Sequence, residues 1–294
     1  MRLYILSRRA TLYTTRRFTK TARMLGHVAR VLDPLGCMLH TARGRHTIQY
    51  HEKQLRLPEA VLPRIGGPSA AYSLAVLQQF EARGVCVVNR SEAIARARDK
   101  LRSLQLLAEQ HVPIAATVMT RDPSRLAESI DMVGGPPVIL KLLQGTQGIG
   151  VILADSYQTA KETLEALWQL GQNILIQKFI SESKGRDIRA LVVGQKVVTA
   201  MRRVARAGEF RSNIHRGGVG EPLELGDRQR EVALKAAAVM GLEVAGVDLL
   251  EGEDGPIVTE VNSSPGFEGL EKASGLDIAR EIIEHAVRLV DSSE

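Results

Sequence analysis

A glycine-rich segment, Gly145-Thr146-Gln147-Gly148-Ile149-Gly150, constrains the fold of this chain more than any other feature. Closely spaced glycines let backbone N–H groups approach an anion, as they do in phosphate-binding loops. A dinucleotide-binding loop or a Walker loop would open a helix, and a Walker loop would carry its lysine within the motif. Here the apolar run Val151-Ile152-Leu153 follows directly, and Lys141 precedes the loop. The segment is therefore predicted to join two antiparallel strands, 138–141 and 151–154, either as a phosphate-binding flap or as a merely tight turn.

Two apolar strands near the end of the chain, 244–250 and 257–262, carry acidic residues at positions that a hairpin would bring together. A three-residue turn, Glu253-Asp254-Gly255, would place Gly255 in a left-handed conformation. With that turn, Asp248 lies opposite Glu260. The hairpin therefore predicts a pair of neighbouring carboxylates on otherwise apolar strands.

Asn262 extends this pair, because side chains two residues apart share one face of a strand. Two carboxylates and an amide oxygen would then converge where unpaired charge is costly. Oxygen ligands without nearby His or Cys favour Mg²⁺ or Mn²⁺, and such sites are usually completed by substrate phosphates. The alternative is that Asp248 and Glu260 lie at strand ends in solvent or pair with arginines.

The segment 202–216 is rich in arginine and contains a single acid, Glu209. Its arginines are Arg202, Arg203, Arg206, Arg211 and Arg216. Guanidinium groups bind phosphate and carboxylate through paired hydrogen bonds, and Ser212 and Asn213 add donors. Such a run is as often a solvated surface, but beside a flap and a metal-binding hairpin it is interpreted as anion recognition.

The order of strands and helices predicts an α/β and α+β protein with three lobes. Strands at 3–6, 28–32, 60–63 and 85–88 indicate a small parallel sheet at the N-terminus. Later strands are expected to form hairpins at 138–141, 151–154, 174–179, 187–193, 196–201, 244–250 and 257–262. Helices are expected at 16–25, from 69 onwards, and at 91–109, 124–133, 157–170, 227–240 and 275–290.

The positive charge of the chain is concentrated in its first third. The net charge is +6, but residues 1–95 carry 15 Lys and Arg against 5 Asp and Glu, and the remainder is net acidic. A basic lobe suits an acidic partner. Eight Lys or Arg precede the first acid, Asp33, which also suits a mitochondrial transit peptide. The strand–helix–strand pattern of residues 3–32 favours folded structure instead.

Only two cysteines, Cys37 and Cys86, are present, so a disulfide framework or a structural zinc site is not expected. No apolar run approaches the length that crosses a bilayer. We therefore expect a cytoplasmic protein without a membrane partner.

Taken together, these residues resemble the ATP-grasp superfamily and, within it, the RimK family of ligases over essentially the whole chain. The segments that carry the resemblance are 5–8, 63–66, 95–100, 131–135, 145–150, 187–189, 210–213, 216–218, 244–248 and 260–262. The resemblance implies an ATP-grasp fold. Its expected units are a pre-ATP-grasp domain at 1–95, a central lobe with the flap at 96–178, and a C-terminal lobe with the metal site at 179–294.

The resemblance also implies roles for individual residues. Catalytic roles are expected for Arg202 and Lys141, and metal ligation for Asp248, Glu260 and Asn262. Residues expected to bind the nucleotide are Lys100, Lys141, Gly145, Thr146, Gln147, Gly148, Gln177, Lys178, Phe179, Asp187, Arg211, Ser212 and Asn213. Lys178 departs from the family, which commonly has Glu there. The change is harmless if backbone groups read adenine, and it weakens ATP binding if a carboxylate is needed.

The implied activity is ATP-dependent addition of glutamate to the C-terminus of small ribosomal subunit protein six through an acyl phosphate. The implied cofactors are ATP and two Mg²⁺ or Mn²⁺ ions, and the implied assembly is a homo-oligomer such as a tetramer. Two alternatives stay open. One is the same chemistry on a carrier protein, an amino acid or a cofactor, and the other is an RNA-binding protein, which would explain the basic lobe but not the carboxylates.

Overall fold

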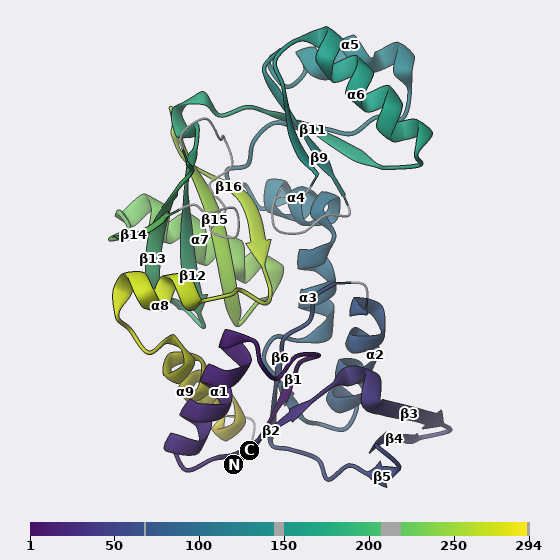
Figure 1. Ribbon diagram of the computed structural model, residues 1–294, viewed down its shortest axis with the longest axis vertical. Helices are drawn as coiled ribbons and strands as arrows, with labels where there is room; N and C mark the ends of the chain where they lie inside the picture. Colours follow the sequence, from purple (N-terminus) through teal and green to yellow (C-terminus); the bar gives the residue numbers. More distant parts are fainter. Residues whose placement is uncertain (68, 144–149, 207–218, 293–294) are drawn as a thin grey trace.

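The computed structural model describes residues 1–67, 69–143, 150–206 and 219–292 (Figure 1). The strands of these residues form four sheets. Within the described ranges, no helix has both the length and the apolar character needed to cross a membrane. Seven of the expected site residues lie outside the described ranges: Gly145, Thr146, Gln147, Gly148, Arg211, Ser212 and Asn213.

The N-terminal sheet is parallel, as the sequence predicts. Its strands, in spatial order, are β2 (Val28–Leu32), β1 (Arg2–Leu6), β6 (Ala60–Pro63) and β7 (Cys86–Val87). The helices α1 (Tyr13–Met24) and α2 (Ala70–Glu81) connect its strands. Apolar residues alternate between the two faces, so that Leu3 and Ile5 pack with Phe18 of α1, whereas Tyr4 and Leu6 pack with Phe80 of α2. The predicted strand–helix–strand unit is thereby confirmed.

A small antiparallel sheet in the N-terminal lobe was not expected from the sequence. It consists of β3 (Cys37–Ala42), β4 (Arg45–Tyr50) and β5 (Lys53–Gln54). Its strands are rich in polar and basic residues and bury only Cys37 and Ile48 in the core of the lobe. A strand that buries so few residues has little apolar periodicity, which is why the pattern did not reveal it.

The helix expected at 91–109 is two helices, α3 (Ser91–Arg98) and α4 (Lys100–Glu109). Asp99 separates them with an extended backbone (φ −84°, ψ 101°), and its carboxylate accepts a hydrogen bond of 3.0 Å from the Arg102 N–H. This is the geometry of a helix N-cap. Asp99 therefore starts a new helix and makes Lys100 its first residue.

The central lobe has an antiparallel sheet in the order β10 (Val151–Ala154), β9 (Val138–Leu142), β11 (Ile174–Lys178) and β8 (Thr117–Val118). One face packs against α5 (Leu126–Asp131) and α6 (Tyr157–Gln169), where Val138 and Leu140 enter the core. Side chains alternate along a strand, so Lys141 lies on the opposite face. The strands β9 and β10 pair in the predicted antiparallel arrangement.

The C-terminal lobe has a five-stranded antiparallel sheet. The spatial order is β14 (Val219–Leu223), β13 (Lys196–Val204), β12 (Arg186–Val193), β15 (Val244–Gly252) and β16 (Gly255–Asn262). The helix α7 (Asp227–Met240) packs on one face of the sheet. The helices α8 (Glu268–Ser274) and α9 (Ile278–Asp291) lie on the other side, next to α1 of the N-terminal lobe (Figure 1).

The hairpin of β15 and β16 reaches the predicted pairing by a different route. Asp248 does lie opposite Glu260, but Gly252 pairs with Gly255, so the turn has two residues where three were expected. A β-bulge beside Asp248 inserts Thr259, whose Oγ1 donates to the Asp248 backbone O at 3.2 Å. The bulge restores the register that the shorter turn would have shifted.

Candidate active site

The residues expected to bind metal share one face of the C-terminal sheet, opposite the face covered by α7. Arg189 pairs with Asp248, and Asp248 pairs with Glu260, so the three form one row across neighbouring strands. Asn262 pairs with Gly246, one pair of residues further along the same face. The hairpin thus brings Asp248, Glu260 and Asn262 together.

Two arginines hold the carboxylate of Asp248, which is buried. Arg189 donates from Nε to Oδ1 at 2.7 Å and from Nη2 to Oδ2 at 2.6 Å. Nη2 of Arg203 lies 3.1 Å from Oδ2. Burial alone would raise the pKa of Asp248, but the two guanidinium groups outweigh burial and hold that pKa below its ordinary value. Asp248 is therefore ionised at neutral pH. It pairs with arginines, as the alternative interpretation had it, and it also lies beside the other expected metal ligands.

Arg203 extends this network to Asp187. Its Nε donates to Asp187 Oδ1 at 2.7 Å, and its Nη2 donates to Oδ2. Burial alone would lower the pKa of Arg203, but Asp248 and Asp187 together raise it. Both oxygens of Asp187 are thus engaged by an arginine. A nucleotide that contacts Asp187, as expected, would have to share the carboxylate with Arg203.

Glu260 lies beside Asp248 at the surface of the sheet. Its side chain reaches solvent, yet the surrounding protein and the charge of Asp248 raise its pKa above the ordinary value. Because the side chain reaches solvent, a ligand can contact its carboxylate. Nearby, Asn262 donates from Nδ2 to the Gly246 backbone O at 3.3 Å and lies 3.5 Å from Asp248 Oδ2.

The side chains of Asp248, Glu260 and Asn262 fit a hard divalent cation. Burial and the neighbouring charge of Asp248 both raise the pKa of Glu260, and a dication beside the two carboxylates would offset both effects. Among the described residues, no group of three or more His, Cys, Asp and Glu could hold a metal. A metal here would therefore need the amide oxygen of Asn262 and oxygens from a substrate.

Two lysines, Lys100 of α4 and Lys141 of β9, lie close enough to Glu260 to interact with its charge. Burial lowers the pKa of Lys141, and Glu260 partly opposes that shift. Burial also lowers the pKa of Lys100, and the charge of Glu260 partly opposes that shift as well. Nζ of Lys100 donates to the Leu142 backbone O at 2.8 Å, at the end of β9. Cations from the central lobe thus lie near a carboxylate of the C-terminal lobe.

The segment expected to bind adenine, residues 177–179, lies at the end of β11. Gln177 is buried, shares the sheet face of Lys141, and donates from Nε2 to Thr117 Oγ1 at 2.7 Å. The Lys178 side chain is exposed and alternates to the other side, while its backbone N–H donates to the Ala116 backbone O at 2.9 Å. Phe179 is half-buried just beyond the strand. Because the Lys178 side chain points away from the face of Lys141, a lysine in place of glutamate leaves that face unchanged.

The position of Arg202 counts against its expected catalytic role. Arg202 pairs with Ile188, which lies in the core beneath α7, so its side chain is on the face opposite Asp248. Its Nη2 lies 3.3 and 3.4 Å from the carboxylate oxygens of Glu251. The next residue, Arg203, reaches the carboxylates instead. The predicted strand ended at residue 201, so sequence reasoning assigned no face to either arginine.

Arg189 was not assigned a role from the sequence, and Arg203 was assigned one only as a member of the arginine-rich segment 202–216. A usable signal existed for Arg189, because Asp187 and Arg189 are two residues apart on one strand and must share a face. No comparable signal existed for Arg203. Its face depends on the register between β12 and β13, which contains a bulge at Leu191/Val192.

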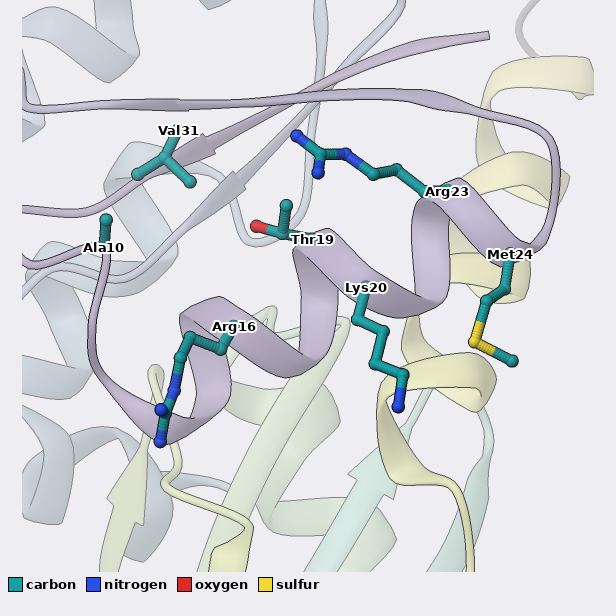
Figure 2. A pocket seen from close by; sticks show the side chains of 7 residues that line it. All are labelled: Ala10, Arg16, Thr19, Lys20, Arg23, Met24 and Val31. Atoms are coloured by element: carbon teal, nitrogen blue, oxygen red, sulfur yellow. The ribbon is translucent and has the colours of Figure 1, made fainter.

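A separate shallow cavity of about 490 Å³ lies along α1, away from the carboxylates (Figure 2). Its lining contains three cations and no acid. The residues that line it are Ala10, Arg16, Thr19, Lys20, Arg23, Met24 and Val31. We call this surface the α1 groove. Within the described part of the chain, Arg16, Lys20 and Arg23 have no ion-pair partner, so the groove carries uncompensated positive charge.

Arg17 of the same helix has a structural role. Its Nε lies 3.0 Å from Glu271 Oε2, and its Nη2 lies 2.7 Å from Asp277 Oδ1. Tyr13 donates to the same Glu271 at 2.6 Å, and this hydrogen bond raises the pKa of Tyr13 to about 12. These contacts tie α1 to α8 and to the start of α9.

Comparison with known families agrees with this architecture. A model of the RimK-like ATP-grasp domain matches residues 97–286, and a model of the RimK PreATP-grasp domain matches residues 1–94. The chain belongs to the RimK family. The expected family and the ATP-grasp fold are thereby confirmed.

Members of the RimK family are similar to this chain over nearly their whole length. A probable alpha-L-glutamate ligase of Citrobacter koseri is 49% identical over 284 residues, which cover 97% of this chain and 95% of that protein. A ribosomal protein bS6–L-glutamate ligase of Escherichia fergusonii is 50% identical over 283 residues, covering 96% and 94%.

Solved structures share the RimK-family fold at lower identity. The ATP-grasp ligase PsnB, complexed with a phosphomimetic variant of its minimal precursor, Mg and ADP, aligns with a TM-score of 0.78 at 22% identity, covering 98% of both chains. A RimK domain protein ATP-grasp from Sphaerobacter thermophilus aligns with a TM-score of 0.74 at 23% identity, covering 97% and 99%. These likenesses establish the fold.

Proposed function

We propose that this protein is an ATP-dependent ligase that adds glutamate residues to the C-terminus of ribosomal protein bS6. The observation that carries the proposal is the proximity of Asp248, Glu260 and Asn262 to Lys100 and Lys141, in a chain about 50% identical to a bS6–glutamate ligase. Neighbouring carboxylates and lysines suit a metal-bound triphosphate.

The nucleotide would lie between the central and C-terminal lobes. Lys100 and Lys141 would contact its phosphates, and the backbone around Gln177, Lys178 and Phe179 would contact adenine. Asp248, Glu260 and Asn262 would hold Mg²⁺, which when bound neutralises phosphate charge. We also propose that Mn²⁺ can replace Mg²⁺ and that a second ion binds with the nucleotide. Asp187 and the residues at 145–148 and 211–213 would make further contacts with the nucleotide.

The reaction needs ATP because a carboxylate has no leaving group at neutral pH. The γ-phosphoryl group would pass to the acceptor's terminal carboxylate and release ADP. The amine of glutamate would then attack the acyl phosphate, form the amide bond and release phosphate. The chain would position the reactants and stabilise developing charge, with Arg203 and Arg189 next to the carboxylates and Lys141 opposite them.

The acceptor becomes more acidic with each glutamate added, and the uncompensated cations of the α1 groove suit such a tail (Figure 2). Arg16, Lys20 and Arg23 are spaced i, i+4 and i+7, so they share one helix face over about 10 Å at 1.5 Å per residue. Alternate side chains of an extended peptide recur roughly every 6.6 Å. Two to three carboxylates of the tail can therefore meet the groove at once.

We also propose the division of the chain into units at 1–95, 96–178 and 179–294, and assembly into a homo-oligomer such as a tetramer. The three large sheets, one in each unit, support the division. Light scattering of the purified protein tests the assembly, since a monomeric mass would contradict it.

Intact-mass spectrometry tests the proposed function. Purified ribosomal proteins are incubated with the enzyme, ATP, Mg²⁺ and glutamate. We expect mass increases in steps of one glutamate residue on bS6 alone. Modification of a different protein would identify that protein, and not bS6, as the acceptor. ATP turnover with no modified protein would point to a free amino acid or a cofactor as acceptor. ATP turnover stimulated by RNA alone would contradict the ligase.

A further inference from the structure

Arg64 connects the N-terminal lobe to the loop that follows the candidate metal ligands. It is the first residue after β6, at the carboxyl-terminal edge of the parallel sheet, where α/β proteins commonly bind ligands. Its Nη2 donates to the backbone O of Ser264 at 3.1 Å and of Pro265 at 2.9 Å. These carbonyls lie two and three residues beyond Asn262.

The loop held by Arg64 folds back onto the sheet next to Asn262. A Cβ atom at Gly246 would lie 2.8 Å from Pro265 Cβ, so Pro265 rests directly on Gly246. Gly246 pairs with Asn262 and shares a sheet face with Asp248, two residues away. The Arg64 guanidinium therefore holds the loop that rests on the carboxylate-bearing face of the sheet.

Arg64 has no acidic partner among the described residues. Burial lowers its pKa to about 10, and no neighbouring charge contributes to the shift. Within the same residues, its Nε and Nη1 make no hydrogen bond, and its side chain retains contact with solvent. An enclosed cation with unused donors is unfavourable unless an anion binds it.

Asn89 provides an informative contrast. It also connects the N-terminal lobe to this region, since its Nδ2 donates to the backbone O of Val244 at 2.7 Å and of Ser263 at 2.8 Å. Its Oδ1 accepts from the Val244 N–H at 2.8 Å. Every polar group of the Asn89 side chain is used, so this residue is structural, whereas Arg64 retains binding capacity.

We propose that Arg64 binds a carboxylate of a reactant at the active site. The inference rests on the proposed function, in which both the acceptor tail and free glutamate carry carboxylates. Arginine suits this role, because its planar guanidinium has several donors. Nη2 can continue to donate to the loop carbonyls while Nε or Nη1 donates to a carboxylate. The ATP phosphates are a poorer match, because the lysines expected to contact them belong to the central lobe.

The test compares the wild type with Arg64→Lys and Arg64→Gln in steady-state ligation of glutamate to a peptide that ends in two glutamates. For the substrate whose carboxylate Arg64 binds, either the peptide or glutamate, we expect KM to rise roughly 30-fold in Arg64→Gln. In Arg64→Lys, which keeps the charge but loses the fork, we expect roughly tenfold. A rise for the peptide identifies the acceptor as the source, and a rise for glutamate identifies the amino acid. KM for ATP should stay within about twofold of wild type.

Arg83→Gln is the matched control, because Arg83 is an exposed cation of the same lobe that also donates to a backbone carbonyl, that of His46, at 2.8 Å. It should leave all three KM values unchanged. A purely structural Arg64 would instead lower the melting temperature and kcat and leave both carboxylate KM values at the wild-type level, which would overturn the inference.

A binding measurement separates failure of the inference from failure of the proposed function. Glutamate and the peptide are titrated calorimetrically into each variant with a non-hydrolysable ATP analogue and Mg²⁺. Binding by the wild type that weakens in Arg64→Gln supports the carboxylate site even if no ligation is detected. Equal binding by the wild type and Arg64→Gln, or no binding by the wild type, refutes the site whatever the ligation assay gives.

Discussion

Arg189 holds Asp248 across neighbouring strands with two hydrogen bonds of 2.7 and 2.6 Å, so the acid at the centre of the candidate metal site also neutralises the half-buried Arg189 and, through a second contact, the buried Arg203. Asp248→Asn would leave Arg189 and Arg203 with less counter-charge in the protein interior. We expect the free energy of unfolding to fall by about 3 kcal/mol, measured by urea denaturation without metal.

The control for this variant is Asp254→Asn, in the exposed turn of the same hairpin. It should change stability by less than about 0.5 kcal/mol. Equal stability of Asp248→Asn and the wild type would show that the two arginines do not depend on this carboxylate.

Adjacent arginines on β13 should differ sharply in activity. Arg203 contacts Asp187 and Asp248, whereas Arg202 lies on the opposite face near Glu251. We expect Arg203→Gln to lower kcat by roughly 100-fold or more, and Arg202→Gln to lower it by less than about threefold, in ATP-dependent ligation. The reverse order would restore the catalytic role that the sequence suggested for Arg202.

The raised pKa of Glu260 gives a pH dependence of stability with a defined sign. A carboxyl whose pKa is higher in the folded state stabilises that state when protonated. Its contribution is complete below its ordinary pKa of 4.5 and is lost as pH rises through the raised value. The stability of the wild type relative to Glu260→Gln should therefore fall as pH increases from about 4.5, as measured by thermal denaturation in a pH series.

Mg²⁺ should counter that loss in the wild type, because the cation favours the ionised carboxylate, and should have less effect on Glu260→Gln. Glu253→Gln, in the exposed hairpin turn, is the control and should follow the wild type. A wild type that becomes more stable relative to Glu260→Gln as pH rises would contradict the assigned shift.

Sequence reasoning located most of this site because strand alternation and hairpin pairing are local rules. They placed Asp248 opposite Glu260, and they placed Asn262 on the same face. The pairing was correct although the turn was wrong, since the bulge at Thr259 compensated for the missing turn residue. Bulges leave no periodic signal, so the same rules could not decide between the faces of Arg202 and Arg203.

Contacts between lobes were beyond sequence reasoning for a different reason. Arg64 and Ser264 are 200 residues apart, and nothing in either local pattern indicates that they meet. The sheet of β3, β4 and β5 was missed because its strands bury too few apolar side chains. The break at Asp99 could have been anticipated, because Asp before a helical run is a common N-cap.

The close packing of Pro265 on Gly246 should make Gly246 intolerant of any side chain. Gly246→Ala would push the loop away from Arg64, and we expect a loss of about 1–3 kcal/mol in unfolding free energy with reduced ligation. Gly266→Ala, in the same loop, has no atom within 4 Å of the added methyl and should be nearly neutral. Two equally stable alanine variants would contradict the close packing.

Charge reversal in the α1 groove should weaken use of the acceptor. We expect Arg16→Glu, Lys20→Glu and Arg23→Glu to raise KM for an acidic acceptor and to flatten its dependence on salt, with KM for ATP unchanged. Lys196→Glu, an exposed cation of the C-terminal lobe, alters the net charge equally and should have no effect. Unchanged acceptor kinetics in all three groove variants would refute the groove as the docking surface.

Arg17 is excluded from this set, although its neighbours in sequence belong to the groove. Its reversal would break contacts with Glu271 and Asp277 and would perturb the junction of α1 with α8. A loss of activity in Arg17→Glu would therefore report on folding and not on the acceptor.

The bulge at Thr259 separates the hairpin into an inner part, whose register positions the carboxylates, and an outer part that ends in an exposed two-residue turn. Changes of length beyond the bulge need not propagate to Asp248 and Glu260. Residues 253–254 are accordingly a suitable place to insert a short affinity tag or a fluorophore-binding peptide, which would report on the enzyme in a cell extract while leaving its chemistry intact.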